Sequence, residues 1–229
     1  MAEAKRGPLS IAEEVVLLAL DDDTGDFIEM PPRSLEIAIT GGLLADLALA
    51  NRIDSDLKSL ILVDREPMGD PLYDVILDAL REATAAPDAS KSIQDWVFAF
   101  SRDADSCLEL ILMRLCDRGI LKSVDRKFLW VYLGRRYPKL DELPDREVRA
   151  RIRSVLLAGE MPDPRDAIII CLSDACGILN GILSDEEASA CETRLDQICK
   201  LDLIGQAVSK AAAAIVLEIQ ASAFTMLPA

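Results

Sequence analysis

The 229-residue sequence contains no histidine. This absence excludes Ser-His-Asp and Cys-His catalysis, the histidine zinc motifs and the most common general base of enzymes. No apolar run reaches the roughly 20 residues that a membrane-spanning helix needs; the longer runs are Ala167 to Leu172 and Ala211 to Leu217. Because no catalytic constellation is present, we expect a non-enzymatic protein without a metal or other cofactor.

Cysteine is present six times, but no two cysteines have C-x-x-C spacing. Most of them fall within apolar helical patterns, and the N-terminal segment lacks the apolar run of a signal peptide. Since disulfides are typical of secreted proteins, we expect small buried thiols rather than bridges. The six are Cys107, Cys116, Cys171, Cys176, Cys191 and Cys199. These features favour a cytoplasmic protein, either free or peripheral at the cytoplasmic face of a membrane.

Positive charge is also scarce. Lysine and arginine number 25 against 40 acidic residues, which gives a formal net charge of −15. A nucleic-acid binder needs a basic face, so we expect no nucleic-acid partner. A contact with anionic lipid would have to use a local basic patch, working against the field of the remaining surface.

Helical patterns dominate what is present. Ser10 and Glu13 form a capping box before an apolar run, and Ser34 opens a long, nearly apolar helix. Gly41 and Gly42 inside that helix indicate either the close approach of another backbone or a tolerated weak point. Further helices are expected over residues 72–84, 93–100, 105–118, 145–157, 163–179, 185–203 and 204–224, with short strands near 53–64 and 120–133.

Two acidic motifs predict ordinary structure. Asp21 to Asp23 with Gly25 resembles a calcium loop only loosely, because the twelfth position, which should be glutamate, is Pro32. A solvated turn is the interpretation. The carboxylate pairs Glu13–Glu14 and Glu186–Glu187 lie in helical patterns, where such pairs are usually solvated or capping.

The segment DRKFLWVYLGRRYPKL, residues 125–140, gathers four of the ten aromatic residues together with five basic ones. Its β-forming residues, with those of GILKSV before it, predict a β-hairpin around Asp125 and Arg126. Strand alternation would place Phe128, Trp130 and Tyr132 on one face. The other face would carry Leu129, Val131 and Leu133.

A strand that is apolar on both faces needs cover on both sides, and three readings stay open. In the first, the hairpin belongs to the core, with ordinary charges at its ends. In the second, it forms an oligomer contact through Trp130 and Tyr132. In the third, it contacts anionic lipid, with rings at headgroup level and basic side chains on phosphates. The lipid-contact residues would be Arg126, Lys127, Phe128, Trp130, Arg135 and Arg136.

Five segments occur in a familiar order: LSIAEEVVLLALDDDTGDF, GGLLADLALANRI, PMGDPLYDVILDAL, CDRGILKSVDRKFLWVYLGRRYP and PDPRDAIIICLSDACGIL. Together they resemble the Golgi phosphoprotein 3 family, in particular its bacterial branch, over residues 9–225. The resemblance implies a mainly α fold: one compact helical domain with short β-hairpins, one of them protruding. We expect a flexible N-terminus over residues 1–8 and the family domain over residues 9–229.

The resemblance also implies function. Eukaryotic members bind phosphatidylinositol 4-phosphate, coatomer and glycosyltransferase tails, use the hairpin in self-association and membrane contact, and are not known as enzymes. Their headgroup residues, one tryptophan and three arginines, fall here on Pro31, Thr40, Asp105 and Leu108. None matches, and Arg33 and Arg102 are the nearby substitutes.

We therefore expect a peripheral membrane adaptor that binds anionic lipid headgroups and unnamed protein partners as a homo-oligomer. The alternative is a protein-binding module that self-associates through its hairpin and has no lipid role.

Overall fold

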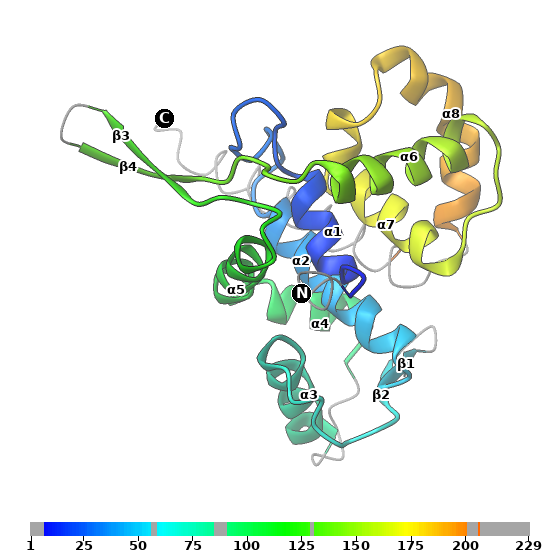
Figure 1. Ribbon diagram of the computed structural model, residues 1–229. Coiled ribbons are helices and arrows are strands. Elements are labelled where there is room, and N and C mark those ends of the chain that lie inside the picture. The colour runs from blue at the N-terminus through cyan, green and yellow to red at the C-terminus, as the bar shows by residue number, and fades with distance from the viewer. Residues whose placement is uncertain (1–6, 56–58, 85–90, 129–130, 201–205, 207–229) are drawn as a thin grey trace, which may run out of the picture.

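Helix α1 (Ile11–Leu18) lies at the centre of a mainly α fold (Figure 1). The computed structural model describes residues 7–55, 59–84, 91–128, 131–200 and 206. The expected capping box starts α1: the Ser10 hydroxyl accepts from the Glu13 amide at 3.1 Å, and the Glu13 carboxylate accepts from the Ser10 amide at 2.9 Å. Every residue of α1 is buried, so the helix is core on all sides.

Helix α2 (Ser34–Leu49) packs closely on α1 because Gly42 has no side chain. A Cβ at Gly42 would lie only 2.9 Å from the Cα of Ala12. Of the two readings of this glycine, the close approach of a backbone is confirmed. Asp46 of α2 joins the pair further, since its carboxylate accepts from the Ile11 amide at 2.9 Å and thereby caps a free N–H group of α1.

The remaining helices lie on two sides of α1 and α2. Helices α6, α7 and α8 are on one side in Figure 1, and α3, α4 and α5 are on the other. Their bounds are α3 (Pro71–Thr84), α4 (Ile93–Phe100), α5 (Ala104–Asp117), α6 (Leu143–Leu157), α7 (Pro164–Ala175), the 3₁₀ helix η2 (Ile178–Gly181) and α8 (Asp185–Cys199). Within the described residues, no helix is long and apolar enough to cross a membrane.

These bounds confirm the expected helices with three differences. The helix expected over 185–203 ends at Cys199, with Lys200 as its C-cap, and residues 201–203 lie outside the described residues. The helix expected over 163–179 stops at Ala175, because Gly177 adopts a left-handed backbone with φ 78° before η2 begins. The helix expected over 204–224 lies outside the described residues, apart from Gln206. Residues 1–6 of the expected N-terminal segment also lie outside them.

Both expected hairpins are present. Strands β1 (Ile53–Ser55) and β2 (Leu60–Leu62) form a small antiparallel pair beside the end of α2. Strands β3 (Val124–Phe128) and β4 (Val131–Arg136) form the second pair, which projects away from the helices in Figure 1. Because the ribbon projects, the interpretation that places this hairpin in the core is wrong for the part beyond its base.

The turn of the second hairpin was misplaced by the sequence argument. Asp125 and Arg126 lie within β3, and the chain reverses between Phe128 and Val131. Phe128 and Val131 are direct cross-strand partners, so they belong to two different strands rather than to one continuous strand. A register shift follows between Arg126 and Lys127, which breaks the simple alternation assumed for one continuous strand.

The base of the hairpin is fixed to the helical body. The Tyr137 amide donates to the Gly25 carbonyl at 2.6 Å. Gly25 has φ 70°, and a Cβ there would lie 2.4 Å from the nitrogen of Pro138, so only glycine fits. The ammonium of Lys139, on a side chain only 3% exposed, pairs with Asp145 of α6 at 2.9 Å and also with Asp22.

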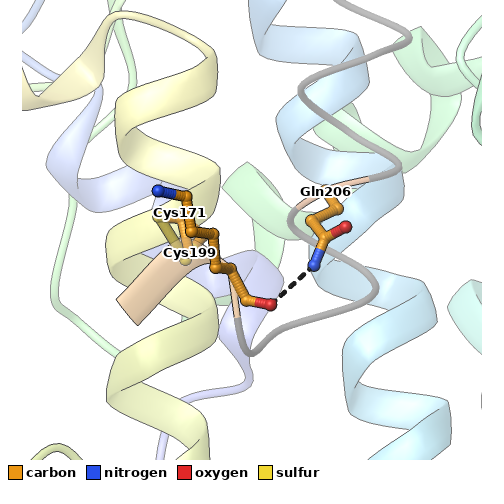
Figure 2. Close-up of a disulfide and its surroundings, with 4 residues drawn as sticks. Cys171, Cys199 and Gln206 are labelled. Carbon is orange, nitrogen blue, oxygen red and sulfur yellow. Dashed lines mark hydrogen bonds between the residues drawn. A yellow bond between two sulfur atoms is a disulfide. The ribbon is translucent and has the colours of Figure 1, made fainter. Parts of the chain in front are cut away.

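The cysteines depart from expectation. Cys171 of α7 and Cys199 of α8 form a disulfide with a Cα separation of 5.3 Å, as Figure 2 shows. The prediction of six buried thiols is therefore wrong for this pair, which the sequence separates by 28 positions. Cys176 and Cys191 are buried free thiols as expected, whereas Cys107 and Cys116 are only half-buried.

Candidate functional site

Arg33 and Arg102, the two substitutes proposed from the sequence, meet at one aromatic ring. The guanidinium carbon of Arg102 lies 4.8 Å from the ring centroid of Phe98, and that of Arg33 lies 5.9 Å from it. Both distances are within the range of cation–π attraction. Arg33 also donates to the Ser101 hydroxyl at 3.3 Å, and that hydroxyl donates to the Phe98 carbonyl at 3.1 Å.

The backbone at Arg33 is strained. Arg33 stands at the N-cap of α2 with φ 64° and ψ 8°, a left-handed conformation that is uncommon for residues other than glycine. Its side chain does not cap the helix. The first turn of a 16-residue helix thus presents its positive end beside two guanidinium groups. Such an arrangement favours an anion.

Neither arginine forms an ion pair with a carboxylate within the described part of the chain. Most other arginines do: Arg52 with Asp64, Arg114 with Asp70, Arg118 with Glu13, Arg149 with Asp145, Arg151 with Glu14, Arg153 with Glu187, and Arg165 with Glu14. The protein has 40 acidic residues. It is therefore unusual that two adjacent guanidinium groups have no carboxylate partner in the described part of the chain. We call Arg33, Phe98 and Arg102 the arginine pair site.

The four positions that correspond to the family's headgroup residues do not form this site. Thr40 is 1% exposed inside α2, so it cannot touch a ligand. Pro31 is exposed close to the arginine pair in sequence. Asp105 and Leu108 lie on α5 and line a groove of about 710 Å³ between α5 and the base of the hairpin. Glu109 and Asp117 line the same groove, so it is acidic and does not suit an anionic headgroup.

The hairpin residues are only partly described. Arg135 and Arg136 are exposed on β4, and Arg135 pairs with Asp125 across the strands at 3.5 Å. Trp130 lies outside the described residues. The side chains of Arg126, Lys127, Phe128 and Tyr132 also lie outside the described part, although their backbones are in the strands. The proposed lipid and oligomer contacts of these residues stay predictions.

The acidic pair Glu13–Glu14 is structural: the capping interpretation is confirmed for Glu13, and the solvated one is wrong for both residues. Glu13 and Glu14 are 5% and 6% exposed. Glu13 caps α1 and pairs with Arg118 at 3.2 Å, while Glu14 accepts from Arg151 at 3.0 Å. Because both carboxylates are held by guanidinium groups, the cluster ties α1 to the chain around it rather than offering an acid or a base.

Buried Asp46 belongs to the same cluster. Burial raises the pKa of Asp46, opposed mainly by the hydrogen bonds from the Ile11 and Ala12 amides. The Tyr73 hydroxyl also donates to this carboxylate at 3.2 Å. The polar contacts of Asp46 therefore join α2 to α1 through the two amides and to α3 through Tyr73.

Sequence reasoning missed Phe98 and Ser101, which hold the two arginines together. A usable signal was present: Phe98 and Arg102 are four positions apart at the end of a helix, where such residues are neighbours. The contact with Arg33 had no local signal, because Ser101 and Arg33 are 68 positions apart.

The fold now defines the class of protein: a mainly α protein with a projecting hairpin, and with two adjacent arginines beside the start of a central helix. A family model described as Golgi phosphoprotein 3 matches residues 11–215. The match covers most of the 229 residues, so the chain belongs to the Golgi phosphoprotein 3 family. A comparison with curated proteins finds no match.

Proposed function

We propose that the protein is a non-enzymatic peripheral membrane adaptor that binds an anionic lipid headgroup at Arg33 and Arg102. The observation that carries this proposal is the pair of guanidinium groups without a carboxylate partner in the described structure, beside an uncapped helix start. A headgroup phosphate would supply the missing negative charge and accept charge-assisted hydrogen bonds from both arginines.

The ring of Phe98 has a positioning role in this proposal. It is half-buried and lies under both guanidinium groups, so it limits the directions in which they can point. A ring face attracts cations without neutralising their charge, and the arginines therefore stay available to an anion. The geometry suits the phosphate of any headgroup and contains no element that reads a particular sugar.

The hairpin is the second proposed contact. Arg135 and Arg136 are exposed near its base, and the projecting strands carry Arg126, Lys127 and Phe128 further out. A ribbon that projects from the body can reach a bilayer while the acidic helices stay at a distance. Protein partners would then be recruited by the surfaces that face away from the lipid.

The alternative, a protein-binding module without a lipid role, is supported by the same projecting hairpin. A two-stranded ribbon alone is marginally stable, and a second copy of the chain could cover it through Trp130 and Tyr132. This alternative assigns nothing to Arg33 and Arg102, so those two residues distinguish the two functions.

The test is flotation with phosphatidylcholine vesicles, with and without phosphatidylglycerol. Near a charged surface each basic residue contributes about 1 kcal/mol. Arg33→Ala with Arg102→Ala should therefore weaken binding to the anionic vesicles by about thirtyfold. Neutral vesicles should bind neither protein.

The control variant carries Arg65→Ala and Arg146→Ala. Both residues are exposed, and the double change alters the net charge by the same amount. This control should bind like the wild type. Equal losses in the two double variants would show a general charge effect and remove the arginine pair site. Absence of wild-type binding to any vesicle would leave the protein-binding module as the function.

A further inference from the structure

The Cys171–Cys199 disulfide joins a buried helix to a peripheral one. Cys171 is 1% exposed in the middle of α7, whose residues Ile168 to Ser173 are all buried. Cys199 is the last residue of α8 and is half-buried. Figure 2 shows the bridge between the two helices, with the Lys200 carbonyl accepting from Gln206 at 2.8 Å just beyond it.

Helix α8 has few other apolar attachments. Only Cys191 and Ile198 of its residues are buried. Its first turn is held to α6 by Glu187, which accepts from Arg153 at 2.9 Å. Its middle is held by Arg194, which donates to the Val155 carbonyl. The final turn has buried Ile198 and the disulfide, and the bridge is its covalent attachment to α7.

A groove of about 500 Å³ lies between the same two helices. Pro164, Ala167 and Ile168 line it from α7, and Arg194, Gln197 and Ile198 line it from α8. Ala167 is one turn before Cys171 on the same face of α7, and Ile198 adjoins Cys199. The disulfide therefore links the two walls of the groove close to these lining residues, although neither cysteine lines the groove itself.

We propose that Cys171 and Cys199 form a reversible redox site whose state decides whether the last turn of α8 is fixed to α7. In the reduced state this turn is free to move away from α7 and the groove widens. The proposal goes beyond the lipid-binding function and does not depend on it. In compartments that keep thiols reduced, the disulfides that do form are usually transient and have a catalytic or redox-sensing role.

The chemistry is thiol–disulfide exchange with a small thiol such as glutathione. Its thiolate attacks the Sγ of half-exposed Cys199, the S–S bond breaks, and Cys171 leaves as a thiolate that takes a proton. A second glutathione thiolate attacks the glutathione sulfur of the mixed disulfide. This step releases Cys199 as a thiol and forms oxidised glutathione, so two electrons pass to the protein. Oxidised glutathione reverses both steps.

The two neighbouring thiols do not compete. Burial raises the pKa of the Cys176 thiol to about 12, with a smaller contribution from the charge of Asp174. Burial likewise raises the pKa of Cys191. Only a thiolate attacks a disulfide, so these protonated thiols leave the bridge between Cys171 and Cys199 unscrambled. The site then has two defined states.

The test uses the full chain equilibrated with oxidised or with reduced glutathione, quenched with acid, unfolded in urea so that the buried thiols are accessible, alkylated with N-ethylmaleimide and analysed by mass spectrometry. In the oxidising buffer, four of the six cysteines should be alkylated, with a bridge between the peptides of Cys171 and Cys199. In the reducing buffer all six should react. Amide exchange in the last turn of α8 should be faster by about tenfold or more in the reduced protein, with α1 and α2 unchanged, because only local opening differs.

Two variants sharpen the result. Cys171→Ser with Cys199→Ser should show the faster α8 exchange in both buffers. Cys107→Ser with Cys116→Ser removes two half-buried free thiols and should respond like the wild type. Six reactive cysteines in the oxidising buffer would overturn the proposal, as would equal α8 exchange in the two wild-type states. If the first variant does not fold, the wild-type comparison still decides.

Discussion

At Gly42 a single missing methyl group sets the distance between α1 and α2. Alanine is the better helix former by about 1 kcal/mol. However, its Cβ would lie 2.9 Å from the Cα of Ala12, and overpacking of this kind costs about 1–3 kcal/mol. We expect Gly42→Ala to lower the free energy of unfolding by up to about 2 kcal/mol in urea denaturation.

The calibration for that measurement is Ala150→Gly at an exposed position of α6. This change alters helix propensity alone and should cost about 1 kcal/mol. A Gly42→Ala protein more stable than the wild type would show that the two helices can separate without a penalty.

Glu187 gives the fold a defined dependence on pH. The hydrogen bond from Arg153 lowers the pKa of Glu187 from 4.5 to about 2, assisted by the Ser184 amide. A carboxyl with a lowered folded-state pKa stabilises the fold above its ordinary pKa and loses that contribution as the pH falls through the folded value. Glu187→Gln should therefore be destabilising at pH values above 4.5, with the deficit shrinking toward zero near pH 2.

Glutamine keeps the capping-box geometry at this position, so the change isolates the charge. Urea denaturation at neutral and at acidic pH measures the deficit. Glu186→Gln, at the exposed neighbouring residue, is the matched control and should show a smaller deficit at neutral pH. A deficit of constant size from neutral to acidic pH would mean that Glu187 acts through its shape alone.

The hairpin is the element on which the two proposed functions differ. If Trp130 and Tyr132 contact a second copy of the chain, the protein should sediment as an oligomer. Trp130→Ser with Tyr132→Ser should then shift it toward monomer in analytical ultracentrifugation. The apolar area lost from the contact is the physical cause.

The matched control replaces two exposed apolar residues elsewhere, Val63→Ser and Val75→Ser, whose side chains are 57% and 56% exposed. It should leave the sedimentation unchanged. A wild-type protein that stays monomeric at high concentration would rule out self-association through the hairpin.

The elements differ in how well sequence specifies them. Helices with local caps, such as Ser10 before α1 and Ser184 before α8, begin where the sequence predicts, because the signal lies within four residues. The hairpin turn lies four residues after its predicted position at Asp125 and Arg126, because β-forming residues run through it without a break. The register shift in the second hairpin depends on pairing between strands, which no single segment encodes.

The charge of the whole molecule limits its membrane affinity. If Arg126, Lys127, Arg135 and Arg136 each contribute about 1 kcal/mol at an anionic surface, the sum of about 4 kcal/mol corresponds to only millimolar binding. Repulsion from a protein of net charge −15 subtracts from that sum. We expect weak, reversible flotation that disappears at high salt, since screening acts over about 8 Å at physiological ionic strength.

Flotation of a variant with these four basic residues changed to serine should be weaker than that of the wild type at low salt. Binding should follow total anionic lipid, because Pro31, Thr40, Asp105 and Leu108 do not supply the family's headgroup contacts. Tight selectivity for phosphatidylinositol 4-phosphate at matched total charge would contradict this expectation and indicate a more specific pocket.

At this scale the sequence indicated the family and the class of fold, but only parts of the site. Arg33 and Arg102 were identified by proximity to family positions, whereas their meeting at Phe98 depends on how α2 and α4 pack. The disulfide was missed for the same reason. Cys171 and Cys199 belong to different helices, and only their packing brings the two sulfur atoms together.

The fixed base of the hairpin has a mechanical consequence. Lys139 forms ion pairs with Asp22 and Asp145, and the Tyr137 amide donates to the Gly25 carbonyl. These contacts hold the base of the ribbon to the helical body. A partner that pulls or turns β3 and β4 therefore also moves α6 and the turn after α1, because these contacts hold them together. Whatever holds the hairpin thereby also dictates which side of the helical body faces outward.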